Sequence, residues 1–202
     1  MFEPRQFPFP KRVLLRIHRD LATIVRPFEG YHRSDLSDIE VIIILLEDRN
    51  FPEHRGIDFK SILRELLKMC TLRRFGGAST IDMQFVRTMT GFKQKTLRRK
   101  LYEMFLAYLL QFHMSKLAIL RCYLEVVYLG SGLQGIRSAA RTVFEKEVSE
   151  LAIDEAAQIA AMMVYPKPLN PTAAWTRNVQ RRAAYGLRLF RKLGHRYKQR
   201  FD

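Results

Sequence analysis

The sequence has few cysteines, few acidic residues and no long apolar run, and each shortage excludes a class of protein. Only two cysteines occur among 202 residues, too few for a disulfide-stabilised scaffold or for a cysteine-rich zinc site. Cys70 and Cys122 both stand in helical-looking apolar surroundings, so we expect two buried free thiols. The aliphatic run Val41–Leu46 is far too short to cross a bilayer.

The first residues do not read as an export signal. Such a signal has a basic start, an apolar stretch and a small-residue cleavage site, whereas residues 1–30 mix charges with apolar positions. The sequence therefore predicts no transmembrane or signal segment. If the protein works at a membrane, we expect it to lie on the surface or to be tethered by something else.

Basic residues greatly outnumber acidic ones, at 35 against 20, which gives a formal net charge of +15. A field of this sign attracts nucleic acid, an anionic membrane or a phosphate-bearing ligand. Composition does not choose among these partners, and a solvated basic surface is the simpler alternative.

Apolar residues recur at helical spacing over most of the chain, and the sequence predicts an all-α fold. Residues 1–30 form a basic amphipathic segment, which either rests on anionic lipid or is a first core helix with one solvated face. Residues 31–202 form the main domain, which ends in a basic helix. Glycines at 130, 132 and 135 predict a flexible loop. The expected helices in the main domain are roughly 37–48, 58–75, 82–89, 96–113, 115–128, 136–144, 154–165 and 173–193.

A distinctive string of residues begins at the end of the apolar run. Residues 47–58 read EDRNFPEHRGID and fit the pattern E-D-x-x-F-x-x-H-x-G-x-D. Glu47, at the end of an apolar helix, is placed to act as a general base or acid. Taken alone, a glutamate at a helix end is more often an ordinary surface residue, so the weight rests on the surrounding pattern.

Four more strings follow in order along the chain. They are GASTIDMQFVR at 77–87, RKLYE at 99–103, KLAILRCYL at 116–124 with YLG at 128–130, and EAAQIAA at 155–161 with YP at 165–166 and NP at 170–171. Together the five strings resemble the ordered motifs of the peptidoglycan glycosyltransferases, glycosyltransferase family 51. The resemblance covers roughly residues 35–172.

This resemblance implies a lysozyme-like helical domain that polymerises lipid II into glycan strands and releases undecaprenyl pyrophosphate. Glu47 maps onto the family's catalytic base, and the transfer is expected to invert the anomeric centre. Glu103 maps onto the second family carboxylate, which either holds basic groups near the leaving pyrophosphate or organises the cleft. Inverting glycosidases keep their carboxyls about 6.5–9.5 Å apart, so we expect Glu47 and Glu103 to lie well separated across a cleft.

The resemblance also assigns substrate-binding residues. Its basic cluster, which would neutralise the departing diphosphate, consists of Arg87, Lys95, Arg99 and Lys100. Ser79, Thr80 and Gln84 belong to the stretch that lines the family's donor site, although Ser and Thr at a helix start are also ordinary caps. Lys116 either contacts phosphate or simply starts its helix.

Further residues of the first motif are expected to support the site. They are Asp48, Phe51, His54, Gly56 and Asp58. His54 and Asp58 also have the chemistry of metal ligands or of an acid pair, but stabilising the loop after Glu47 is the role we favour. No cofactor is required by the sequence, and a divalent cation is left open. Four aromatic residues are expected in the core: Phe105, Tyr108, Phe112 and Trp175.

Three acidic residues depart from the family pattern. Asp82 stands where Thr is commoner, Glu125 where Asn is usual, and Glu145 where Gly is typical. Asp82 and Glu125 add negative charge near the expected phosphate region, so their effect on affinity or substrate preference is open.

The resemblance implies lipid II, the growing glycan strand and an anionic membrane surface as partners, at the outer face of a bacterial inner membrane. Cell-wall synthesis proteins are possible further partners. Nucleic acid is not expected, because no recognition helix or stacking module is evident. The alternatives are a catalytically silent lipid II or cell-wall-binding scaffold and a lysozyme-type hydrolase. Retention of Glu47 and Glu103 argues against the first, and the basic cluster argues against the second.

Overall fold

The computed structural model describes residues 11–25, 35–70, 79–92 and 96–201, without the side chains of 66 and 68–70. This part of the chain is helical apart from one small hairpin, which confirms the predicted all-α class. The helices are α1 (Lys11–Val25), α2 (Asp38–Glu47), α3 (Phe59–Cys70), α4 (Ile81–Thr90), α5 (Leu97–Leu110), α6 (Lys116–Val126), α7 (Ile136–Phe144), α8 (Ile153–Met162) and α9 (Ala173–Lys198). The hairpin pairs β1 (Tyr128–Gly130) with β2 (Leu133–Gln134), and a 3-10 turn, η2, covers Val148–Glu150.

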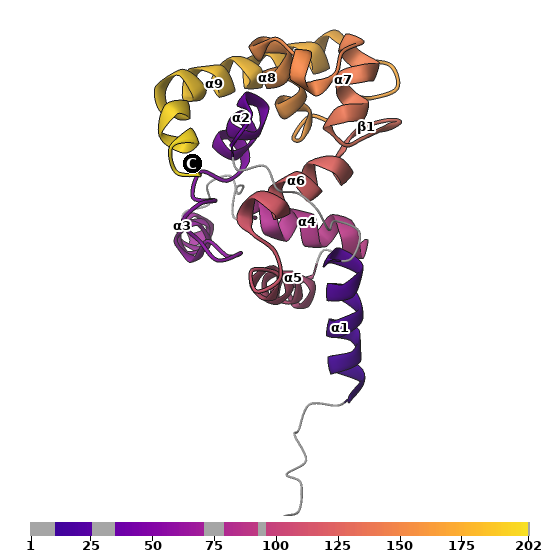
Figure 1. Ribbon diagram of the computed structural model, residues 1–202, viewed down its shortest axis with the longest axis vertical. Helices are drawn as coiled ribbons and strands as arrows, with labels where there is room; N and C mark the ends of the chain where they lie inside the picture. The colour runs from indigo at the N-terminus through magenta and orange to yellow at the C-terminus, as the bar shows by residue number, and fades with distance from the viewer. Residues whose placement is uncertain (1–10, 26–34, 71–78, 93–95, 202) are drawn as a thin grey trace, which may run out of the picture.

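Helix α2 is apolar on every side, and it packs against both α8 and α9 in the upper group of helices in Figure 1. Every residue from Ile39 to Leu45 is buried, as expected of a helix without a polar face. The predicted capping box is present, and the backbone N–H of Ser37 donates to Glu40 Oε2 at 2.8 Å. Arg121 of α6 donates to the other oxygen of Glu40 at 2.8 Å, so this buried acid is paired with a cation.

The lower group of helices in Figure 1 is built around α4, which packs against α5, α6 and α1. From Ile17 onward along α1, Ile24 is buried and Ile17 and Leu21 pack against the core. Along its first half, Leu14 and Leu15 are exposed. Helix α1 is therefore a core helix over only part of its length.

The predicted helix starts at Thr96 and Ser115 are confirmed, since each side chain caps its helix. The predicted end of the last helix at 193 is wrong, because α9 continues to Lys198. The reason is that Gly194 lies inside the helix, where an added Cβ would come within 3.0 Å of the Phe190 ring. Close packing, and not a break, explains this glycine.

The glycine-rich segment at 130–135 forms the hairpin, which differs from the predicted flexible loop. Gly130 has a φ of 144°, and an added Cβ would lie 2.3 Å from the carbonyl oxygen of Lys167. The backbone N–H of Lys167 donates to Leu129 O, and that of Ser131 donates to Lys167 O, both at 2.8 Å. The glycine thus permits two chain segments to pair closely.

The prediction that Phe105, Tyr108 and Phe112 belong to the core is wrong, because all three are exposed. The buried residues of α5 lie on its other side, and they are Glu103, Leu106, Ala107 and Leu110. A helix with two apolar stripes gives no periodic signal of which stripe faces inward. Trp175 is half-buried against the core, and its indole N–H donates to Tyr165 O at 3.0 Å.

Glu145 occupies a conformation that suits glycine. It caps the C-terminus of α7 with a φ of 57°, and its side chain is exposed. The left-handed region costs roughly 1–2 kcal/mol for residues with a Cβ. This accounts for the glycine that is typical of the family here.

Glu145→Gly should therefore raise the free energy of unfolding by about 0.5–1 kcal/mol, measured by urea denaturation. Thr142→Gly is the matched control, because Thr142 is exposed inside the same helix and glycine there should destabilise. A loss of stability in Glu145→Gly would contradict this account of the cap.

Candidate functional site

Glu47 is the last residue of α2, and its side chain is 11% exposed. Nη2 of Arg182, on α9, donates to Glu47 Oε1 at 2.6 Å and to Leu46 O at 3.3 Å. A charge-assisted bond of this length holds the carboxylate in one orientation. The end of the buried helix therefore presents a carboxylate that a second helix positions.

The loop after Glu47 is fixed by its own motif residues. Asp48 accepts from the backbone N–H of Ile81 at 3.0 Å, and His54 Nε2 lies 2.9 Å from the same carboxylate oxygen. Gly56 has a φ of 80°, and an added Cβ would lie 2.3 Å from the carbonyl oxygen of Ala107. Only a residue without a Cβ fits this approach.

Asp58 anchors the far end of the loop. It accepts from the Ser61 hydroxyl at 2.5 Å, from the Ser61 backbone N–H at 3.0 Å and from the Asn50 amide at 2.8 Å. Burial opposes the charged form of Asp58, but these hydrogen bonds outweigh it and lower the pKa to about 2. The contacts are those of a structural anchor.

Asp82 is fully buried and forms an ion pair with Lys116, whose Nζ lies 2.9 Å from Oδ2. The Gln111 amide also donates to Asp82 at 2.7 Å. Lys116 Nζ further lies 3.4 Å from His54 Nδ1 and 4.4 Å from the centre of the Phe51 ring. The negative charge of Asp82 is therefore neutralised inside the protein, and Lys116 is committed to this network.

Within the described residues, one group has the spacing of a metal site. Asp48, His54 and Asp82 each offer an atom, and these atoms lie within 4.8 Å of one another. The ammonium group of Lys116 already contacts two of the three residues. It supplies the positive charge that a cation would bring, so the geometry fits a Lys-centred network better than a metal.

Glu103 is fully buried and carries two guanidinium groups. Arg87 binds it with Nε and Nη2 at 3.1 and 3.0 Å, and Arg99 Nε lies 3.3 Å from Oε1. Two cations on one carboxylate leave a local charge of about +1. The side chain of Arg87 is 36% exposed, so this residual charge faces solvent.

Tyr123 connects the two carboxylate regions. Its hydroxyl donates to Gln84 Oε1 at 2.8 Å. Burial raises the pKa of Tyr123, the charge of Glu47 raises it further, and Arg87 acts in the opposite sense. The charges of Glu47 and Arg87 thus act on this phenol in opposite senses.

The remaining predicted residues divide by what they contact. Thr80 caps α4, because its hydroxyl accepts from Met83 N and donates to Gly56 O at 2.7 Å. Ser79 and Lys100 are half-buried, and their side chains form no hydrogen bond or ion pair inside the described ranges. Lys95 lies outside the described residues.

Arg182 and Tyr123 were not among the predicted site residues. The sequence does indicate that Arg182 lies on the inner side of its helix, because it stands three residues after Val179 and one before Ala183, both of which are buried. An arginine on the buried stripe of an amphipathic helix needs an acidic partner. Which acid it meets depends on the packing of α9 against α2, which the pattern does not give.

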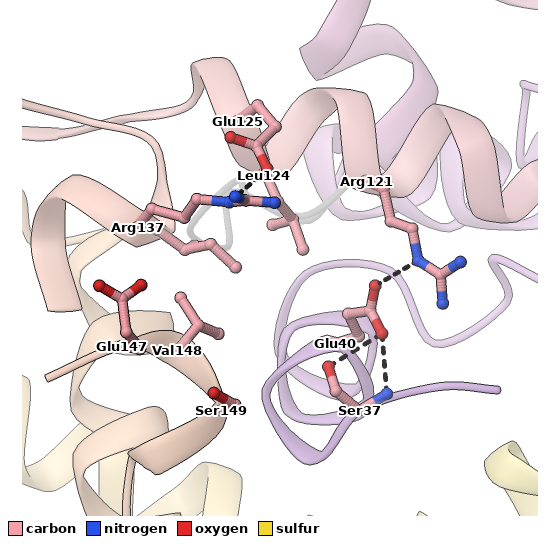
Figure 2. Close-up of a pocket in the computed structure, with 10 residues that line it drawn as sticks. Ser37, Glu40, Arg121, Leu124, Glu125, Arg137, Glu147, Val148 and Ser149 are labelled. Atoms are coloured by element: carbon pink, nitrogen blue, oxygen red, sulfur yellow. Dashed lines mark hydrogen bonds and ion pairs between the residues drawn. The ribbon is translucent and has the colours of Figure 1, made fainter. Parts of the chain in front are cut away.

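A pocket of about 410 Å³ lies away from Glu47, between the start of α2, the end of α6, α7 and η2 (Figure 2). Its charged lining includes Glu40, Glu125 and Glu147. Arg121 pairs with Glu40, and Arg137 lies 2.9 Å from Glu125. The departure at Glu125 is thus neutralised by a local ion pair, and the pocket contains none of the predicted site residues.

Residues 34–190 match the family model described as transglycosylase. The chain belongs to this family. The match confirms the resemblance and the glycosyltransferase class that the five motifs predicted. The chain is 34% identical over 160 residues to a transglycosylase of Cupriavidus necator, covering 79% of this chain and 69% of the relative.

Other relatives carry more specific names. The identity is 34% over 161 residues with the biosynthetic peptidoglycan transglycosylase of Shewanella denitrificans, covering 80% of this chain and 70% of that protein. It is 32% over 189 residues with penicillin-binding protein 1A of Rickettsia felis, covering 92% of this chain but 22% of that protein. The chain thus spans about a fifth of that larger relative. Among the described residues, no helix has both the length and the apolarity to cross a membrane.

Asp58 should make stability depend on pH. Its pKa is lowered when folded, so its stabilising effect is present above the ordinary value near 3.8 and disappears as the pH falls toward 2. Asp58→Asn should lower the free energy of unfolding by about 1–2 kcal/mol at pH 7, after allowance for solvent screening. Urea denaturation from pH 7 to pH 2 should show this difference shrinking below pH 4. A difference that does not change with pH would show that the charge of Asp58 is not its source.

Proposed function

We propose that the chain polymerises peptidoglycan by joining lipid II to a growing glycan strand, with inversion and release of undecaprenyl pyrophosphate. One observation carries this proposal. Glu47 ends a buried helix with its carboxylate oriented by Arg182, and the buried Glu103 holds the guanidinium groups of Arg87 and Arg99. The site thus combines a proton acceptor with cations for a leaving diphosphate.

In the proposed step, Glu47 takes the proton from the 4-hydroxyl of the acceptor sugar. The hydroxyl oxygen then bonds to the anomeric carbon of the donor, and the bond from that carbon to the pyrophosphate oxygen breaks. The electron pair leaves with the pyrophosphate. Arg182, which bonds Oε1 of Glu47 at 2.6 Å, orients the carboxylate for this transfer.

Glu103 is proposed to hold the basic groups, the first of the two roles left open by the sequence. It is fully buried and its oxygens face Arg87 and Arg99, which is poor geometry for exchanging protons with a substrate. The two guanidinium groups are held in place before the substrate arrives. Preorganised cations of this kind stabilise developing charge without having to rearrange.

An exposed apolar stripe on α5 supports work at a membrane surface. It consists of Leu97, Leu101, Phe105 and Tyr108 of α5 and Phe112 in the turn that follows, whose exposed fractions range from 41% to 74%. These side chains recur at helical spacing on one face, and large exposed apolar faces mark interaction surfaces. Together with the basic start of α5, the stripe fits an anionic bilayer, such as the outer face of a bacterial inner membrane.

Polymerisation of labelled lipid II tests the proposed reaction. Wild type should produce glycan strands, and Glu47→Gln should lose at least a hundredfold in rate, because the amide does not accept the proton. The control is Glu53→Gln, which changes an exposed glutamate of the same loop and should stay within twofold of wild type. Lipid II binding without polymer in wild type would favour the scaffold, and cleavage of preformed strands would favour the hydrolase.

Flotation with anionic vesicles tests the membrane surface. The double substitution Phe105→Ser, Phe112→Ser should weaken binding at least tenfold, because two half-exposed rings no longer enter the bilayer. The control is Ile153→Ser, Leu169→Ser, which removes exposed apolar groups from the other part of the fold. Equal loss in both variants would contradict a role for the α5 stripe.

A further inference from the structure

Helix α9 carries a line of basic side chains on its solvent face, which we name the α9 stripe. It consists of Arg177, Arg181, Arg188, Arg191, Lys192 and His195, all exposed. At 3.6 residues per turn these positions fall within about 100° of the helix surface, over a length of about 27 Å. The stripe is thus a row of basic side chains along one face of α9.

The α9 stripe has no acidic partner among the described residues. The ion pairs of α9 join Arg182 to Glu47 and Lys198 to Asp38, and Arg200, just after the helix, pairs with Glu53. All three cations lie off the stripe. Arg181 donates only to Asn178 of its own helix. The charges of the stripe therefore remain available to an external anion.

Keeping this row of charge costs stability. Like charges four residues apart on one helix face, such as Arg177 and Arg181, destabilise the helix. Arg177 also stands near the N-terminus of α9, where the helix dipole disfavours a cation. A surface that keeps such repulsion on one face is best explained by a negatively charged ligand.

The position of the stripe favours one kind of ligand. Figure 1 shows α9 in the upper group of helices and α5 in the lower group. The exposed stripe of α5 lies on the side away from its buried residues, so a bilayer that contacts this stripe is expected to lie away from α9. The α9 stripe also lacks a row of exposed large apolar residues, since the inner side of the helix holds them. A membrane-lying helix needs such residues.

We propose that the α9 stripe binds the peptide-bearing glycan strand through the carboxylates of its stem peptides. This inference rests on the proposed function, whose product is a linear polymer with carboxylates at regular intervals. Arginine predominates in the stripe, and its planar donor group matches a carboxylate. Arg182, on the inner side of the same helix, holds Glu47, so α9 borders the place where the strand is proposed to form.

Binding of preformed strands tests the proposal independently of catalysis. Soluble, uncrosslinked strands are compared before and after an amidase has removed their peptides. The stripe variant is Arg177→Gln, Arg188→Gln, Arg191→Gln. The control, Arg55→Gln, Lys60→Gln, Arg196→Gln, removes the same charge from exposed positions off the stripe. Thermal unfolding confirms that both variants fold.

We expect the stripe variant to bind peptide-bearing strands at least tenfold more weakly than wild type and the control to stay within threefold. Strands without peptides should bind wild type as weakly as the stripe variant does. Equal weakening by both variants, or equal binding of stripped strands, would overturn the proposal. So would a stripe variant that loses affinity for anionic vesicles but not for strands. Failure of the proposed function would show separately, as wild type that binds strands but forms none from lipid II.

Discussion

The bond between Arg182 and Glu47 is the constraint on which the arrangement of the site depends. Helix α2 is buried along its length, so its last carboxylate leaves the apolar core at a fixed point. A buried carboxylate without a cation would be costly, and α9 provides that cation at 2.6 Å. The packing of α9 on α2 therefore also orients the carboxylate of Glu47. A substitution that shifts α9 is expected to change that orientation.

The charges around Glu103 are balanced differently from those around Glu47. One cation pairs with Glu47, whereas the fully buried Glu103 pairs with both Arg87 and Arg99. Two guanidinium groups would repel each other if no anion stood between them, and the shared carboxylate removes most of that repulsion. The result is a small region of net positive charge that exists before a diphosphate arrives, as electrostatic stabilisation of a leaving group requires.

Much of the fold and of the site follows from local sequence signals, because caps and motif spacings act over a few residues. Ser37 with Glu40 and Thr96 mark helix starts by chemistry that the structure confirms. The sequence did not show which face of a helix points toward the core or which distant residues pair. Periodicity does not say which apolar stripe of α5 faces the core, so the outward position of Phe105 was missed, and it does not say which acid Arg182 meets. Both depend on contacts between elements distant in the chain.

The substitution at Asp82 shows how a departure from a family pattern is absorbed by its surroundings. From the sequence alone, the extra carboxylate is expected to repel a phosphate group bound nearby. In the fold it instead pairs with Lys116 at 2.9 Å and accepts a hydrogen bond from Gln111. Lys116 in turn reaches His54, whose other ring nitrogen holds Asp48, next to Glu47. The added charge thus extends a buried network under the loop that follows the proposed base. Because removing one member of such a network leaves another charge buried and unpaired, Asp82 and Lys116 must be understood as a pair, and the basic character of the site rests on the guanidinium groups at Glu103.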